Sequence, residues 1–271
     1  MSSILKKYTD RLESNSDFWF EVARERFDDL RLRFRFGRNA AVPNGTWELI
    51  GDLSGPVTFL SAHDTVRVKA GGNAADTSDG AGARTIRVYG IDDSLNFVSE
   101  DITLAGASAS TSTTTSFWRI CFITVLTVGT YGGSNTGAIT LQDTSATLDL
   151  NIIPAAQSNS ASACYTVPAG KTAYLIGWET HVSSSQAADI RLRSRANISN
   201  TTAPMSPIKT DYEESGVLGN AINQPEGMLA VYPAGTDVWL EVQGSGGATL
   251  VTGAMEFLEV TDEDVTITTS N

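Results

Sequence analysis

The chain has 271 residues, of which 41% are hydrophobic and 18% are charged, so it carries enough apolar material for a packed core and is not a disordered chain. Its formal net charge of −12 repels phosphate backbones, and we therefore expect no nucleic-acid partner for the protein as a whole. The longest apolar run, Ile120–Val128, is too short to cross a bilayer, so we expect no membrane partner.

The N-terminal residues 1–46 are predicted to form a helical arm followed by a short amphipathic strand. Apolar residues recur at helical spacing in two runs, Leu5, Tyr8 and Leu12, then Phe20, Ala23, Phe27 and Leu30. The segment Arg31–Phe36 then alternates charged and apolar residues, which predicts a strand with three arginines on one face and three apolar side chains on the other. Gly37 is expected to end this strand.

Residues 47–154 are predicted to form a first β-sandwich domain, because short β-prone runs alternate there with turn residues. The expected strands are Thr65–Lys69, Arg84–Ile91, Phe97–Leu104, Phe117–Val128, Ala138–Gln142 and Ala146–Ile153. Between them, Gly71–Gly82 and Ala105–Ser116 have the composition of loops.

Residues 155–271 are predicted to form a second, jelly-roll-like sandwich with an acidic and threonine-rich tail. The expected strands are Cys164–Val167, Thr172–Val182, Asp189–Ser194, Met228–Tyr232, Asp237–Gln243 and Ala254–Val260. Two Pro-Ala-Gly turns, ending at Gly170 and Gly235, each precede a strand and indicate two edges of one antiparallel sandwich. The expected fold class is therefore mainly β, with two antiparallel sandwiches behind an N-terminal helical arm.

The residues that carry chemistry in enzymes are sparse and scattered. His63 and His181 lie apart, with neither a nucleophile motif nor clustered zinc ligands around them. The acidic residues favour turns and surfaces: Asn73, Asp76 and Asp79 do not have the spacing of an EF-hand, and Asp211, Glu213 and Glu214 are expected in a loop. We expect no catalytic residues, no cofactor and no metal.

The two cysteines, Cys121 and Cys164, both lie in apolar strand-like stretches, and we expect two buried free thiols; a single disulfide is the alternative. Met1–Tyr8 is polar and basic and no apolar run follows it, so we expect synthesis in a cytoplasm without a secretory signal.

Charge is distributed unevenly along the chain. Residues 1–38 carry nine basic and seven acidic residues, a net charge of +2, whereas the remainder has ten basic and twenty-four acidic residues, a net charge of −14. Because charge matching guides association, we expect the basic segment to contact acidic surfaces of the same protein type, with nucleic acid as the less favoured alternative. The candidate partner-binding residues are Phe18, Trp19, Phe20, Phe27, Arg31, Arg33 and Arg35.

Several motifs resemble a family of virion structural proteins of tailed, especially aquatic, bacteriophages. They are Gly80-Ala-Gly-Ala-Arg-Thr-Ile-Arg-Val-Tyr-Gly-Ile-Asp92, Ser99-Glu-Asp-Ile-Thr-Leu-Ala-Gly106, Thr115-Ser-Phe-Trp-Arg-Ile120 and Cys164-Tyr-Thr-Val-Pro-Ala-Gly-Lys-Thr172. The resemblance covers about residues 47–260 and leaves the N-terminal arm unmatched. It implies a non-enzymatic particle component with β-sandwich domains, made in the host cytoplasm and located in the virion.

Three hypotheses follow. In the first, the chain is a capsid decoration, head-fibre or tail-associated protein that forms a homo-oligomer, for example a trimer, and binds capsid or tail proteins through residues 1–38. Deleting those residues is then expected to leave folded sandwiches that no longer join particles. The second is a carbohydrate- or receptor-binding spike whose aromatic side chains stack on sugars; the candidates are Trp118, Tyr131, Trp178, Tyr212, Tyr232 and Trp239. The third, a polysaccharide-degrading enzyme on a β fold, needs paired carboxylates in a groove.

Overall fold

The computed structural model describes residues 18–183, 186–202, 204–223, 230–246 and 249–262, and within them it is mainly β with several antiparallel sheets. One short helix, α2, spans Phe18–Ala23. The strands are β1 Leu30–Val42, β2 Glu48–Leu49, β3 Val66–Val68, β4 Ala83–Ile91, β5 Phe97–Thr103, β6 Arg119–Val128, β7 Ile139–Asp143, β8 Asp149–Ile153, β9 Cys164–Thr166, β10 Lys171–Val182, β11 Ala188–Arg195, β12 Lys209–Val217, β13 Gly219–Asn223, β14 Ala230–Tyr232, β15 Asp237–Gly244 and β16 Thr249–Thr261.

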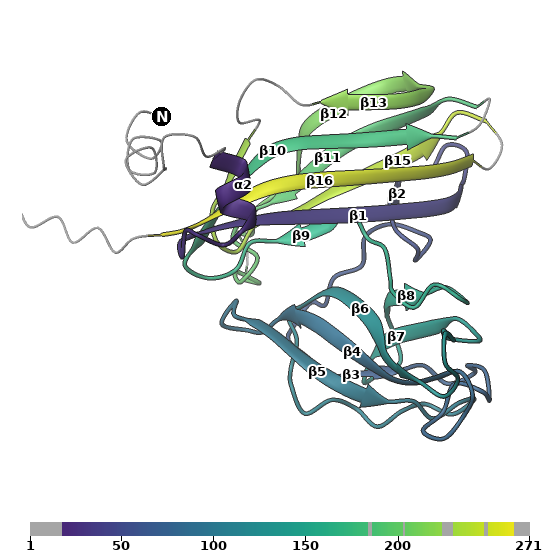
Figure 1. The fold of residues 1–271 in the computed structure, drawn as a ribbon. Helices are drawn as coiled ribbons and strands as arrows, with labels where there is room; N and C mark the ends of the chain where they lie inside the picture. The colour runs from purple at the N-terminus through teal and green to yellow at the C-terminus, as the bar shows by residue number, and fades with distance from the viewer. Residues whose placement is uncertain (1–17, 184–185, 203, 224–229, 247–248, 263–271) are drawn as a thin grey trace, which may run out of the picture.

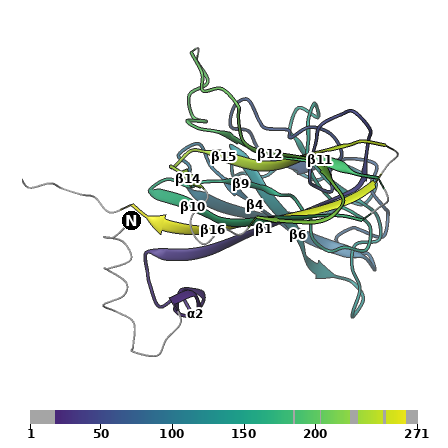
Figure 2. The same cartoon turned by 90° about the horizontal axis from the view of Figure 1, so that it is seen from above.

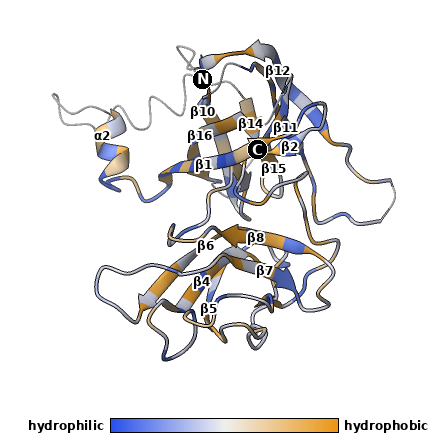
Figure 3. Ribbon diagram, turned by 90° about the vertical axis from the view of Figure 1, so that its right-hand side faces the viewer, coloured by the Kyte–Doolittle hydropathy of each residue, from blue (hydrophilic) through white to orange (hydrophobic). Residues whose placement is uncertain are grey.

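The strands form two bodies, which lie one above the other in Figure 1. The large body holds two five-stranded sheets: the β16 sheet, with order β1-β16-β10-β13 and β14 beside β10, and the β11 sheet, with order β12-β11-β15-β2 and β9 beside β15. The small body holds two three-stranded sheets, β3-β7-β8 and β5-β4-β6. In both bodies hydrophobic and hydrophilic residues alternate along the strands (Figure 3), so each sheet turns one face to a core.

Each body has its own hydrophobic core. In the large-body core, Val42 and Ile50 pack with side chains from the β16 sheet and the β11 sheet, including Leu175, Leu240 and Phe257. The small-body core runs from Val66 to Ile153. From β1 onward the chain therefore starts in the large body, leaves after β2 to form β3–β8, and returns at β9. The three predicted domain ranges remain predictions. The strands β1 and β2 belong to sheets whose other strands come after residue 160.

The predicted strand β1 is present but longer than expected. It pairs with β16 from Leu30 to Val42, so Gly37 does not end it. Gly37 is instead required by close packing, because a Cβ at this position would overlap the carbonyl oxygen of Ile50. Of the second run of helical spacing, Phe20 to Leu30, only the start is helical, in the six residues of α2. The first predicted run, Leu5–Leu12, lies outside the described residues.

The two Pro-Ala-Gly turns lie side by side. Gly170 and Gly235 have φ angles of 65° and 69°, the left-handed conformation that glycine adopts without steric cost. The backbone N–H of Gly235 donates to the carbonyl of Val167 at 2.9 Å, and the N–H of Val167 donates to the carbonyl of Thr236 at 3.0 Å. One turn starts β10 and the other starts β15, so this contact ties the β16 sheet to the β11 sheet.

The acidic cluster expected in a loop lies in a strand instead. Asp211, Glu213 and Glu214 belong to β12, the edge strand of the β11 sheet. Almost every side chain of β12 is exposed on both faces, so the sequence there lacks the alternation that marks a half-buried strand.

Candidate functional site

Helix α2 packs on one end of the β16 sheet, beside the start of β1 and the end of β16 (Figure 2). Its Val22 and the following Phe27 are buried against Leu30, with Leu258 and Val260 of β16 packed around them. Because these sheet residues point away from the large-body core, α2 lies on the outer face of the β16 sheet. We define this outer face by the residues that point away from the core: Leu32, Phe34, Phe36, Glu179, His181, Ala254, Glu256 and Leu258.

The central part of the outer face carries exposed apolar side chains. The register pairs Leu32 with Leu258, Phe34 with Glu256 and Phe36 with Ala254, and paired residues share a face. Leu32, Phe34 and Phe36 are 39%, 55% and 44% exposed. Three large apolar side chains at alternate positions of an edge strand form a contiguous patch, which is the kind of surface that marks an interaction site.

The arginines of β1 point to the other face, toward the interior. Arg33 donates through Nε and Nη2 to the two carboxylate oxygens of Glu259 at 3.2 and 3.0 Å, and Tyr165 donates its hydroxyl to Glu259 at 2.5 Å. Burial raises the pKa of a carboxyl group, but the hydrogen bonds from Arg33 and Tyr165 outweigh it and hold the pKa of Glu259 below its usual value. Glu259 is thus a buried anion with two donors.

The other two β1 arginines also have intramolecular contacts. The guanidinium of Arg35 lies 5.3 Å from the ring centre of Tyr165 and 5.9 Å from that of Phe122, a residue of β6 in the small body. Arg31 donates to the backbone carbonyls of Phe27 and Leu30, both at 2.8 Å. Arg33 and Arg35 therefore tie β1 to β16, β9 and β6, whereas Arg31 bonds only to residues just before it in the chain.

The seven predicted partner-binding residues thus fall into two groups. Trp19 and Phe20 are exposed by 45% and 58%, whereas Phe27 is buried and Phe18 partly buried beside it, with ring centres 6.0 Å apart. The arginines lie on the inner face. The exposed side chains of β1 are instead the apolar Leu32, Phe34 and Phe36, which the same alternation places on the opposite face.

A shallow depression lies at the far end of the outer face from α2. Phe36 and Ala254 contribute apolar surface, and the exposed side chains of Glu179 and His181 contribute polar groups. His181 Nδ1 is 2.5 Å from Asn220 Oδ1, so the imidazole is oriented by β13. The depression is lined by Phe36, Glu179, Thr180, His181, Asn220, Thr252, Gly253 and Ala254.

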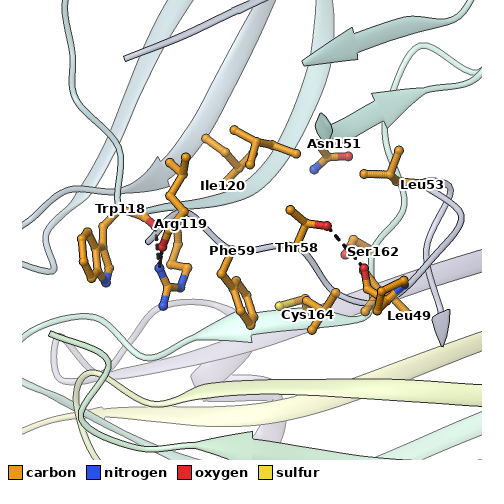
Figure 4. Close-up of a pocket in the computed structure, with 14 residues that line it drawn as sticks. Leu49, Leu53, Thr58, Phe59, Trp118, Arg119, Ile120, Asn151, Ser162 and Cys164 are labelled. Atoms are coloured by element: carbon orange, nitrogen blue, oxygen red, sulfur yellow. Dashed lines mark hydrogen bonds between the residues drawn. The ribbon is translucent and has the colours of Figure 1, made fainter. Parts of the chain in front are cut away.

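A second hollow lies between the two bodies, where the segment after β2 meets β6, β8 and β9 (Figure 4). Its volume is about 30 Å³, space for roughly two water molecules and too little for a small-molecule substrate. Cys164 borders it. Both cysteines are free; Cys121 is buried and Cys164 partly exposed, and burial raises the pKa of both thiols.

A buried ion pair beside this hollow joins the bodies. Arg119 of β6 donates Nε to the carboxylate oxygens of Asp237 of β15 at 3.0 and 3.1 Å, and Nη1 to the carbonyls of Leu60 and Trp118 at 3.2 and 2.8 Å. Thr166 Oγ1 donates to Asp237 at 2.6 Å. Burial raises the pKa of Asp237, and the guanidinium of Arg119 opposes that rise. The pair could not be predicted from the sequence, because its two residues are 118 positions apart.

The loop acids considered as calcium ligands have structural partners. The Asp76 carboxylate accepts backbone N–H groups of Ala83, Thr136 and Gly137, each at 2.8 Å. Asn73 accepts the N–H of Ala75 at 2.9 Å, an Asx turn as expected. Among the described residues, no three His, Cys, Asp or Glu side chains gather as a metal site requires, and no described helix is long and apolar enough to span a bilayer.

Comparison with known proteins gives no family. No family model and no curated protein matches the chain. Among solved structures, the infectious bursal disease virus Gt strain is 10% identical, with 86% of this chain and 73% of that chain covered and a TM-score of 0.24. The Gx strain of the same virus is 14% identical, with 88% and 73% covered and a TM-score of 0.23. A VP2 protein of this virus from derived particles is 8% identical, with 92% and 80% covered and a TM-score of 0.19. At such TM-scores, these likenesses carry no argument about this chain.

Proposed function

We propose that this chain is a non-enzymatic virion structural protein that assembles with itself and with other particle proteins through the outer face of the β16 sheet. The observation that carries the proposal is the row of exposed Leu32, Phe34 and Phe36 on an edge strand.

We interpret the large body as a jelly-roll-like sandwich and the small body as a second sandwich inserted between β2 and β9. The motif resemblance to tailed-phage virion proteins supports a place on a phage particle, as a capsid decoration, head-fibre or tail-associated protein. Synthesis would take place in the host cytoplasm, and capsid or tail proteins would be the partners.

The test is the composition of purified particles. Particles from a culture that produces the chain should contain it at a fixed ratio to the major capsid protein, measured by quantitative mass spectrometry across a density gradient. The proposal fails if the chain is abundant in the lysate yet missing from the particle fractions.

The anchoring role of the N-terminus needs a shorter deletion than residues 1–38. Such a deletion removes most of β1 together with the Arg33–Glu259 pair, so the large body would lose its edge strand. Deleting residues 1–29 keeps β1. The shorter deletion should leave a folded protein, checked by circular dichroism, that no longer enters particles; normal entry would refute the anchor.

The spike hypothesis receives less support from the structure. Four of the six candidate stacking residues are buried, namely Trp118, Trp178, Tyr232 and Trp239. Tyr131 is fully exposed and Tyr212 is 37% exposed and packed on Trp178. These side chains therefore do not form one platform for a sugar ring.

A further inference from the structure

The outer face of the β16 sheet carries three features in a row. At one end, α2 presents Phe20, which is 58% exposed, with the guanidinium of Arg24 at 5.4 Å from its ring centre. The middle is the apolar row with Phe34 at its centre. At the other end lies the depression with Phe36 and Glu179.

The two ends complement each other in chemistry. The α2 end offers an aromatic ring and a cation: Arg24 and Arg26, whose side chains are 50% and 53% exposed, share the single, nearly buried carboxylate of Glu21. The depression offers apolar surface from Phe36 and an exposed carboxylate on Glu179. An aromatic ring can pack on Phe36, and the guanidinium beside it can pair with the carboxylate of Glu179.

The two ends cannot meet within one molecule. They lie along β1, one at its start and the other at its middle: Leu30 under α2 and Phe36 are six residues apart, about 20 Å of extended strand. A second copy turned by a two-fold axis that lies in the plane of the contact and crosses β1 at Phe34 brings each α2 onto the depression of the other copy. In such an isologous contact every pairing occurs twice, and the residue at the axis meets itself.

We propose that a second copy of this chain packs on the outer face of the β16 sheet in a two-fold dimer, with Phe20 and Arg24 of each copy on Phe36 and Glu179 of the other. This inference rests on the proposed function and names the partner of its surface. The contact covers the apolar row, whose burial supplies the driving force, while the two Arg24–Glu179 pairs fix the orientation.

Sedimentation of the full chain over a range of concentrations tests the proposal. The wild type should be a dimer, and Phe34→Lys should weaken it by about 100-fold or more, because a buried aromatic is lost and two lysines meet at the axis. This substitution should leave the monomer folded, since the new lysine lies opposite Glu256 on β16. Tyr131→Lys is the matched control: it removes the most exposed aromatic, lies in the small body and should leave the dimer unchanged.

A charge swap tests the orientation. Glu179→Arg and Arg24→Glu should each weaken the dimer, whereas the double variant should restore most of the lost affinity, because the pair is rebuilt with reversed sign. A monomeric or trimeric wild type, an unaffected Phe34→Lys dimer, or a double variant no better than the singles overturns the inference. If the wild type is a monomer and still enters particles, only the dimer is refuted. If it is a dimer and is missing from particles, only the virion role is refuted.

Discussion

Replacing Arg119 by methionine should destabilise the protein strongly at neutral pH. The side chains of Arg119 and Asp237 are 3% and 0% exposed, so methionine fills a similar volume but leaves the carboxylate buried with only Thr166 as a hydroxyl donor. Breaking a buried ion pair from one side typically costs about 3–5 kcal/mol, and the same range is expected here. Urea unfolding followed by tryptophan fluorescence at pH 7 measures it.

The pH dependence of this variant gives a second, independent reading. The folded-state pKa of Asp237 is already raised by burial, and removing Arg119 raises it further. A carboxyl group with a raised folded pKa favours the folded state when protonated, and its stability contribution is lost as pH rises from the unfolded pKa, about 3.9, to the folded pKa. The deficit of Arg119→Met relative to wild type should therefore be larger at pH 7 than at pH 4.5.

A double-mutant cycle completes the test. Asp237→Asn alone leaves the buried guanidinium without an anion, but combined with Arg119→Met it removes both charges, so the double variant should cost clearly less than the two single costs added together. The reasoning is refuted if Arg119→Met loses less than about 1 kcal/mol at pH 7, if its deficit does not shrink at low pH, or if the costs simply add.

Three further variants probe other contacts. Arg33→Met should lower the free energy of unfolding in urea by about 1–2 kcal/mol, less than for a fully buried pair because Arg33 is 42% exposed. The wild type should lose stability as pH falls through the depressed pKa of Glu259, and this loss should be smaller in the variant. An acid transition identical to that of the wild type would contradict the prediction. Gly37→Ala should lower the melting temperature sharply or prevent folding, because its Cβ overlaps Ile50; a wild-type melting curve would refute the close packing. Asp76→Ala should cost about 3 kcal/mol by leaving three N–H groups unbonded, and added Ca²⁺ should not shift wild-type melting; a clear shift would restore the cation interpretation.

Strand positions were largely predictable because most strands are buried on one face. The expected Thr172–Val182 differs from β10 by one residue, and Arg84–Ile91 from β4 by one residue. Strand β12 was missed because both of its faces are exposed, which removes the period-two signal. The prediction of a mainly β chain is confirmed, and the sandwich and helical-arm details remain proposals.

The orientation of β1 could not be predicted from its alternation. A period of two defines two faces without saying which is inward, and a row of arginines usually faces solvent. Here Glu259 of β16, Tyr165 of β9 and Phe122 of β6 converge on the arginine face, and none of them is near β1 in sequence. The Arg119–Asp237 pair is likewise formed across 118 residues. Such partnerships depend on tertiary proximity, which one sequence does not reveal.

The pairing of β1 with β16 also constrains how the chain can fold as it is synthesised. Arg33 and Glu259 are 226 residues apart, and at ribosomal speeds of about 5–20 residues per second the wait between them is roughly 10–45 seconds. During that time strands β3–β8 are contiguous and can assemble their own core, whereas β1 has no neighbour for its backbone hydrogen bonds. Until β16 is made, β1 combines exposed Leu32, Phe34 and Phe36 with unpaired backbone groups, the combination that favours aggregation of unprotected strands.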